Sequence, residues 1–196
     1  MLVLTPLNDL TFVSNFHNIT LSQVYKETED TTVIAFDVPQ ELKEEFKYRS
    51  GQFLTLRTMI NGEDVRRSYS LCSSPLDDEW KVAVKEIFEG KFSTHVNRQL
   101  KSGDVLQVAA PSGDFGIEAP DKNEAKNYIA FAAGSGITPM LSIIKTHLAS
   151  EPNAKFKLFY LNRTVKSIIF KEEIEALKNR YLSRFEVFYF LSRENR

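Results

Sequence analysis

The sequence predicts two domains, an antiparallel β-barrel followed by a partial α/β domain built on a truncated parallel sheet. Three observations predict this. Short β-rich segments separated by turn residues fill the first half, a polar stretch interrupts the pattern at residues 119–126, and strands alternate with helices afterwards. The 196 residues are enough for two domains of about 100 residues each. We place the first domain at residues 1–118, with residues 1–16 as an extension, and the second at residues 126–196.

Six short segments of the first domain are rich in β-branched and aromatic residues, which is typical of strands. We expect these strands at Ile19–Tyr25, Thr31–Val38, Gln52–Arg57, Arg66–Cys72, Trp80–Ile87 and Val105–Ala109. The pair Asn61-Gly62 predicts a tight hairpin between two of them, and Ser93–Leu100 predicts one short helix. Many short strands with hairpins and a single small helix favour an antiparallel barrel.

The second domain repeats a strand followed by a helix. We expect strands at Asn127–Ala133, Phe156–Leu161 and Phe185–Leu191, and helices at Pro139–Ala149 and Ser167–Arg180. Because the strands start at regular intervals with helices between them, the pattern indicates a βαβαβ unit with parallel strands.

Composition excludes several classes of function. The net charge of -1 provides no general attraction for nucleic acid or an anionic membrane, and no apolar run is long enough to span a bilayer. The single cysteine, Cys72, excludes an internal disulfide and a four-thiolate iron–sulfur cluster, and we expect it to be a buried structural residue. The three histidines lack metal-ligand spacing, so we expect no metal site. With no secretory signal visible, the reducing cytoplasm is the expected compartment.

A glycine-rich turn follows the first strand of the second domain. It reads Gly134-Ser135-Gly136-Ile137-Thr138-Pro139, with the proline suited to the first turn of the following helix. Glycines let a ligand approach the backbone closely, and the N–H groups of a helix start favour an anion such as a pyrophosphate. The alternative is a tight strand–helix connection without a ligand.

The third glycine and the acidic residue of the common dinucleotide fingerprint are both missing. Instead, the ends of the next two strands carry Asn162-Arg163 and Ser192-Arg193, beside the expected nucleotide. Arginine and hydroxyl donors suit a phosphate monoester, which favours NADP(H) over NAD(H). For Arg163 a solvated loop position remains equally open.

A second candidate site lies on the strand containing Arg67-Ser68-Tyr69-Ser70. Alternation places Arg67 and Tyr69 on one face, where the first can hold a phosphate and the second can stack on a flat ring. A cross-strand salt bridge with a core tyrosine explains the same pattern, so this segment alone decides nothing.

Taken together, these segments resemble the motifs of the ferredoxin–NADP⁺ reductase superfamily. Arg67-Ser68-Tyr69-Ser70 is similar to its Arg-x-Tyr-Ser flavin motif, Gly134 to Pro139 to its Gly-x-Gly-x-x-Pro nicotinamide motif, and Ser192-Arg193-Glu194 to its 2′-phosphate segment. The resemblance covers the chain from about His17 onward and is greatest to the phenylacetyl-CoA oxygenase reductase group. It implies an FAD-binding barrel followed by a Rossmann-like nucleotide domain.

The resemblance also implies roles for individual residues. Arg67 would bind the FAD phosphates, Tyr69 would pack on the flavin, and Ser70 would lie near flavin N5. Thr138 would lie between flavin and nicotinamide, so Ser70 and Thr138 are the candidate catalytic residues. Further FAD contacts would come from Lys85, Gly90, Lys91, Phe92, Ser93 and Thr94, and Pro111-Ser112-Gly113-Asp114-Phe115 is similar to a loop near the flavin edge.

The implied activity is hydride transfer from NADPH to FAD, with electrons passed on to an iron–sulfur protein or an oxygenase component. Two alternatives remain open: a flavin-binding module without NADPH turnover, and a reductase of a free flavodoxin or ferredoxin.

The chain also departs from the family pattern, most clearly at its C-terminus. Ser50-Gly51-Gln52 replaces the family's Pro-Gly-Gln, and two further strands, a Cys-Gly-Pro-like motif and a [2Fe–2S] domain do not follow Arg196. We therefore expect a truncated fragment that self-associates through an exposed sheet edge.

Overall fold

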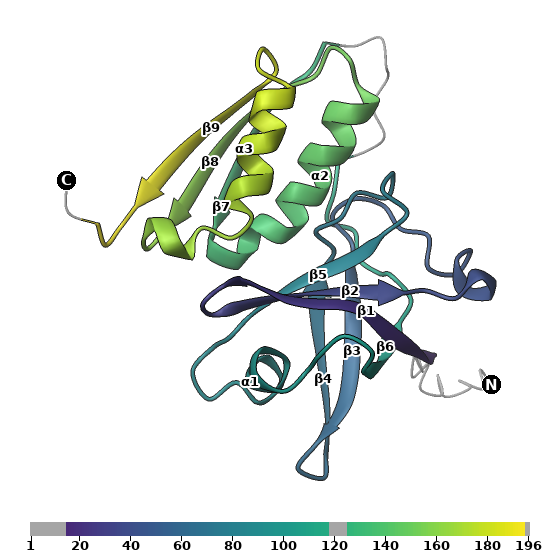
Figure 1. Ribbon diagram of the computed structural model, residues 1–196. Coiled ribbons are helices and arrows are strands. Elements are labelled where there is room, and N and C mark those ends of the chain that lie inside the picture. Colours follow the sequence, from purple (N-terminus) through teal and green to yellow (C-terminus); the bar gives the residue numbers. More distant parts are fainter. Residues whose placement is uncertain (1–14, 118–124, 195–196) are drawn as a thin grey trace, which may run out of the picture.

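The computed structural model describes residues 15–117 and 125–194, which form two packed domains (Figure 1). An antiparallel sheet makes up the first domain, and two helices on a parallel sheet make up the second. Most of the expected extension at residues 1–16, and the centre of the expected boundary at residues 119–126, lie outside the described residues.

Six strands form the sheet of the first domain within the described residues. They are β1 (Phe16–Thr28), β2 (Thr31–Asp37), β3 (Phe53–Ile60), β4 (Glu63–Ser70), β5 (Trp80–Lys85) and β6 (Val105–Ala109). Their order is β4-β3-β6-β1-β2-β5, and all pairings are antiparallel. The two edges meet only through an isolated bridge between Leu71 and Val82, so the expected barrel is not closed by a continuous ladder.

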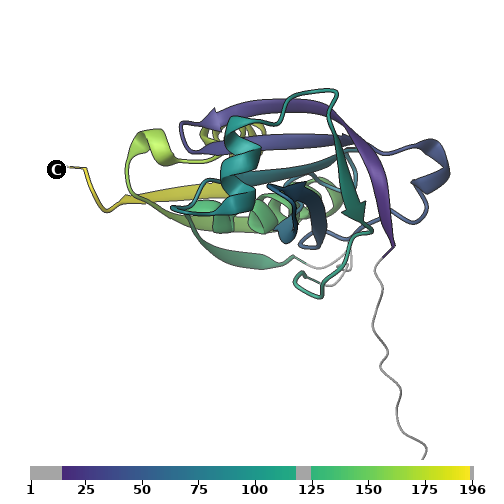
Figure 2. The same ribbon diagram turned by 90° about the horizontal axis from the view of Figure 1, so that it is seen from below.

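Local sequence signals account for the hairpin and the helix of this domain. Asn61 and Gly62 both adopt positive φ, at 52° and 81°, and connect Ile60 to its partner Glu63, which confirms the predicted hairpin. Helix α1 (Lys91–Arg98) starts two residues earlier than expected and lies across the strands (Figure 2). Its Phe92 packs into the hydrophobic core of the first domain.

Three parallel strands form the sheet of the second domain in the described part of the chain. The order is β7 (Asn127–Ala133), β8 (Lys155–Asn162) and β9 (Phe185–Leu191), as the strand–helix repeat predicted. Helices α2 (Ile137–Ser150) and α3 (Lys171–Arg180) cover the same face of the sheet (Figure 1). The expected single helix from Ser167 is wrong, because Phe170 adopts a left-handed conformation with φ 61° and α3 starts only after it.

The two domains share buried apolar contacts. Val33, Cys72 and Ala83 of the first domain belong to the same buried cluster as Ile137 and Leu141 of α2. Cys72 is a free, buried thiol, as expected, and burial raises its pKa above the ordinary cysteine value. None of the helices in residues 15–117 and 125–194 is both long and apolar enough to cross a bilayer.

Candidate cofactor site

A cleft of about 740 Å³ opens where β4, the loop after β5 and the start of α2 come together. Arg67, Tyr69 and Ser70 come from the first of these elements, and Gly90 comes from the second. The full lining comprises Arg67, Ser68, Tyr69, Ser70, Ala83, Lys85, Ile87, Phe88, Glu89, Gly90, Lys91, Phe92, Ser93, Ser135, Gly136, Thr138 and Pro139. Both domains therefore supply walls of one site.

Strand β4 presents a cation, a phenol and a hydroxyl to this cleft. The Arg67 guanidinium donates to the carbonyl of Arg66 at 2.7 Å and forms no ion pair with a carboxylate of the described residues. Burial raises the pKa of Tyr69 to about 12, although the Arg67 charge acts in the opposite direction. The Tyr69 phenol is therefore protonated at neutral pH, and its ring centre lies 5.7 Å from that of Phe92.

The loop between β5 and α1 forms a tight turn at Gly90. A Cβ on Gly90 would come within 2.4 Å of both Ile87 Cγ1 and Ser93 Oγ. Ser93 Oγ accepts from the Ile87 N–H and donates to the Gly90 carbonyl, both at 3.2 Å. Because no described side chain caps α1, its first N–H groups stay available at the cleft. Beside them Phe88 is 92% exposed.

The glycine-rich turn forms the opposite wall. Gly134–Gly136 is a 3₁₀ turn, and α2 follows directly, again without a described side-chain cap. Pro139 is thus the third residue of α2 and not the first, still within the turn where an N–H has no helical partner. The buried Thr138 hydroxyl donates to the Ser135 carbonyl at 3.0 Å, which closes the turn. Nothing lies within 4 Å of where a Cβ on Gly134 or Gly136 would be.

A second hollow of about 490 Å³ adjoins the first at the carboxyl edge of the parallel sheet. Ser135 and Lys85 line both hollows, so the two hollows are neighbours. Asn162, Arg163 and Ser192 belong to the second hollow. Neither amide atom of the buried Asn162 has a hydrogen-bond partner within 3.5 Å among the described residues, so the amide can accept or donate to a ligand.

Most of the residues singled out from the sequence line these two hollows. Thr94 and Arg193 do not, and Phe92 and Lys85 line them with side chains that already have other partners. Phe92 places its ring in the core and offers only its backbone. Thr94 lines a neighbouring hollow and points to Glu86, with Oγ1 3.5 Å from Oε1. Lys85 is paired with Asp30, Nζ to Oδ2 at 3.1 Å. Arg193 lines neither hollow, although its N–H donates to the Arg163 carbonyl at 2.9 Å.

The loop at Pro111 to Phe115 also lies outside the lining of both hollows. It packs against the loop before β3, where the Gln52 side chain donates to the Gly113 carbonyl at 3.1 Å. Sequence reasoning missed Ser68, Ala83 and the loop residues Ile87 to Glu89. The turn signal at Glu89-Gly90 was visible, but it did not indicate which neighbouring side chains would face the cleft.

Comparisons with known proteins agree with this two-domain arrangement. Residues 18–117 match the family described as oxidoreductase FAD-binding domain, and residues 131–196 match the oxidoreductase NAD-binding domain. The chain is 43% identical over 182 residues to one of the subunits of 1,2-phenylacetyl-CoA epoxidase from Escherichia coli K12, and the match covers 93% of this chain and 51% of that protein.

Two further relatives are similar in sequence or in fold. The ferredoxin reductase component of the 3-ketosteroid-9-alpha-monooxygenase of Rhodococcus rhodochrous is 43% identical over 175 residues, covering 88% of this chain and 48% of that protein. The structure of phthalate dioxygenase reductase, a modular protein for electron transfer from pyridine nucleotides to [2Fe–2S], superimposes with a TM-score of 0.71 at 26% identity, covering 89% of this chain and 51% of that one.

The chain thus spans about half the length of the relatives that it matches in sequence. The FAD-binding family matches the first domain and the NAD-binding family matches the second, and each domain supplies one wall of the cleft. The chain belongs to the ferredoxin–NADP⁺ reductase superfamily of FAD- and NAD-binding oxidoreductases.

Proposed function

We propose that this chain binds FAD in the larger hollow and NADPH in the smaller one, and that it transfers a hydride between them. The observation that carries the proposal is that the two hollows share Ser135 and Lys85, so that two ligands would touch there. Hydride transfer requires this kind of contact between donor and acceptor rings. FAD, when bound, supplies the hydride- and electron-accepting chemistry.

The residues of the larger hollow fit FAD. The Arg67 cation lacks a carboxylate partner among the described residues, and the start of α1 reaches the cleft without a side-chain cap from them. Unpaired cations and free helix N–H groups favour the pyrophosphate of a dinucleotide. Phe88 offers an exposed ring that could stack on a flat one.

The chain's own residues would bind and orient the reactants. Ser70 and Tyr69 would hold the flavin from β4, and Tyr69 would act as a hydrogen-bond donor because its pKa is raised to about 12. Thr138 would hold the nicotinamide end beside it, from a hydroxyl already fixed by Ser135. No side-chain acid or base is required for the hydride step.

The electron acceptor that we propose is an iron–sulfur protein or an oxygenase component. The relatives support this because their names describe a subunit of an epoxidase, a monooxygenase ferredoxin reductase component and a reductase that delivers electrons to [2Fe–2S]. A [2Fe–2S] cluster would belong to a separate domain or protein, since the chain has one cysteine. We also propose that the chain works in the reducing cytoplasm, in line with that single free thiol.

Purification and reduction test this function against its rival. A yellow chain that NADPH bleaches supports the reductase, with FAD identified after release from the protein. A yellow chain whose flavin is reduced by dithionite but not by NADPH supports a flavin-binding module without NADPH turnover. A colourless protein that does not bind added FAD contradicts both the reductase and the flavin-binding module.

Selectivity for NADPH is proposed to depend on the cations at the carboxyl edge. Replacing Arg193 with alanine should weaken NADPH binding about tenfold and leave NADH binding nearly unchanged, because a charge-assisted contact contributes about 1.5–3 kcal/mol. Dissociation constants for NADP⁺ and NAD⁺, which cannot reduce the flavin, check this when measured by quenching of flavin fluorescence. Arg180→Ala, on an exposed helix end, is the control. Equal weakening of both nucleotides would contradict a role in binding the 2′-phosphate.

We further propose that the uncovered face of the parallel sheet pairs with a second copy of the chain. This face exposes Ile129, Phe131, Leu161, Phe188 and Phe190, with Phe131 69% exposed. The rings of Phe131, Phe159 and Phe188 stack along it at 5.0–5.1 Å between centres. Parallel sheets are normally covered on both faces, so this contact would remove the apolar surface from water. The edge of β7, which pairs with no second strand among the described residues, is the other surface through which the chain would self-associate.

A further inference from the structure

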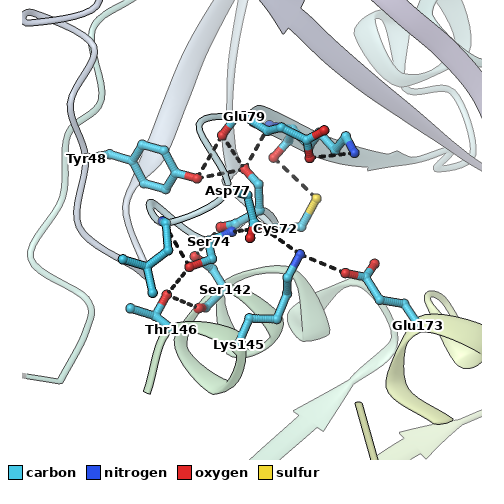
Figure 3. A network of polar contacts seen from close by, with 12 residues as sticks. Tyr48, Cys72, Ser74, Asp77, Glu79, Ser142, Lys145, Thr146 and Glu173 are labelled. Atoms are coloured by element: carbon cyan, nitrogen blue, oxygen red, sulfur yellow. Dashed lines mark hydrogen bonds and ion pairs between the residues drawn. The ribbon is translucent and has the colours of Figure 1, made fainter. Parts of the chain in front are cut away.

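A seam of hydrogen bonds joins α2 to the turn that follows β4 (Figure 3). Ser142 Oγ donates to the Ser73 carbonyl at 2.6 Å, and the hydroxyls of Ser74 and Thr146 lie 2.9 Å apart. Thr146 also donates to the Ser142 carbonyl at 2.6 Å. Two separate hydrogen bonds therefore connect the FAD-binding domain to the NAD-binding domain along one helix.

Lys145 adds a charged link to this seam. Its ammonium lies 2.8 Å from Asp77 Oδ2 and 2.8 Å from Glu173 Oε1, while its side chain is only 18% exposed. Burial alone would lower the pKa of Lys145, but the two carboxylates outweigh it and raise the pKa above the ordinary lysine value. Lys145 thus stays charged and joins the turn of the first domain to α2 and α3 (Figure 3).

The turn that receives these contacts is itself fixed to the first domain. Ser73 Oγ donates to the Glu79 carbonyl at 2.8 Å, and Tyr48 donates to the same carbonyl at 2.9 Å. Asp77 also accepts from the Ser74 N–H at 3.0 Å. Because these bonds hold the turn to the first domain, a contact made to the turn links α2 to the FAD-binding sheet.

The seam lies close along the chain to both candidate catalytic residues. Ser73 and Ser74 follow Ser70 by three and four residues, at the end of β4. On α2, Ser142 and Lys145 follow Thr138 by four and seven residues, so all three lie on one face of the helix. The seam therefore connects the end of the strand that carries Ser70 to the helix that carries Thr138.

We propose that Lys145 and Ser142 are positioning residues that hold the two halves of the cleft at the separation required for hydride transfer. The inference rests on the proposed function, because only a reaction between two bound rings needs this separation. A misplacement of about 1 Å can cost about 100-fold in rate. Neither residue lines the two hollows, so their effect is exerted through the domain arrangement.

Other contacts keep the domains joined when the seam is weakened. The apolar cluster around Val33 and Ala83 remains, as does the bond from the Phe170 N–H to Glu27 Oε1 at 2.8 Å. Loss of Lys145 should therefore loosen the angle between the domains without separating them.

The test compares Lys145→Met with Lys47→Met, which removes a lysine whose ion pair with Glu44 is exposed. In the flavin-free chain, Lys145→Met should speed hydrogen exchange of the amides in residues 72–79 and 137–146, by about tenfold if one such bond is lost. In the flavin-loaded chain it should lower the rate of flavin reduction at saturating NADPH by about 10- to 100-fold. FAD affinity should stay within about twofold of wild type, and Lys145→Arg should restore both measurements.

Ser142→Ala should give the same pattern with a smaller effect, because it removes one neutral hydrogen bond. The inference is overturned if exchange in Lys145→Met equals that of wild type and Lys47→Met, or if exchange rises while the reduction rate at saturating NADPH is unchanged. A wild-type chain that takes up no flavin overturns the proposed function and the positioning role together. In that case the exchange measurement still decides whether Lys145 holds the two domains.

Discussion

Replacing Arg67 with alanine should lower the affinity for FAD by about 10- to 100-fold, because charge-assisted hydrogen bonds contribute about 1.5–3 kcal/mol. Arg67 faces the larger hollow and forms no ion pair with a described carboxylate, so its charge is available to the phosphates. Titration of the flavin-free protein with FAD, followed by quenching of flavin fluorescence, measures the change.

Arg66 is the matched control. It lies next to Arg67 on the same strand, but it is paired with Asp64 at 2.8 Å and does not line the cleft. Arg66→Ala should leave FAD affinity within about twofold of wild type, because the Arg66 charge is paired with Asp64 and lies outside the cleft. Arg67→Lys should have an intermediate effect, since it keeps the charge and loses the planar fork. Unchanged flavin occupancy in Arg67→Ala would remove the assignment of this strand to the phosphates.

Local sequence signals predicted the second domain better than the first. Strands β7 and β9 have the predicted bounds, because each is a continuous apolar run between turn residues. In the first domain β1 extends beyond the predicted strand at both ends. Its register shifts between Leu21 and Gln23, and the alternation of apolar and polar residues along a strand does not reveal such a shift. Closure at Leu71–Val82 depends on long-range pairing, so the sequence could not indicate that the ladder stays open.

The candidate site could be predicted where a short motif determines both the backbone conformation and the side chains that face the cleft. Arg67 and Tyr69 both line the larger hollow, whereas Gly136, expected at the nicotinamide nucleotide, lines the larger hollow and not the smaller one. Thr94 lines neither hollow, because α1 starts at Lys91 and this changes which side chains face the cleft. The seam at Lys145 was not predicted at all, since its partners Asp77 and Glu173 are far apart in the sequence and carry no motif.

Replacing Gly51 with alanine should lower the free energy of unfolding of the first domain by about 3 kcal/mol. Gly51 has φ 96°, a conformation that costs an alanine about 1–3 kcal/mol. The added Cβ would also come within 2.2 Å of the Phe115 carbonyl oxygen and 2.9 Å of its carbon, and backbone atoms cannot rotate away as a side chain does. Overpacking of this kind adds about 1–3 kcal/mol.

Gly62→Ala separates the two causes. Gly62 also has positive φ, at 81°, but nothing lies within 4 Å of its missing Cβ, so only the backbone strain of about 1 kcal/mol should appear. Urea unfolding followed by Trp80 fluorescence measures both variants, since Trp80 is the only tryptophan and is buried in the first domain. Equal losses in the two variants would show that the contact between the Gly51 and Phe115 loops does not limit stability. A larger loss at Gly51 than at Gly62 would show that the close approach of the Phe115 backbone adds to the backbone strain.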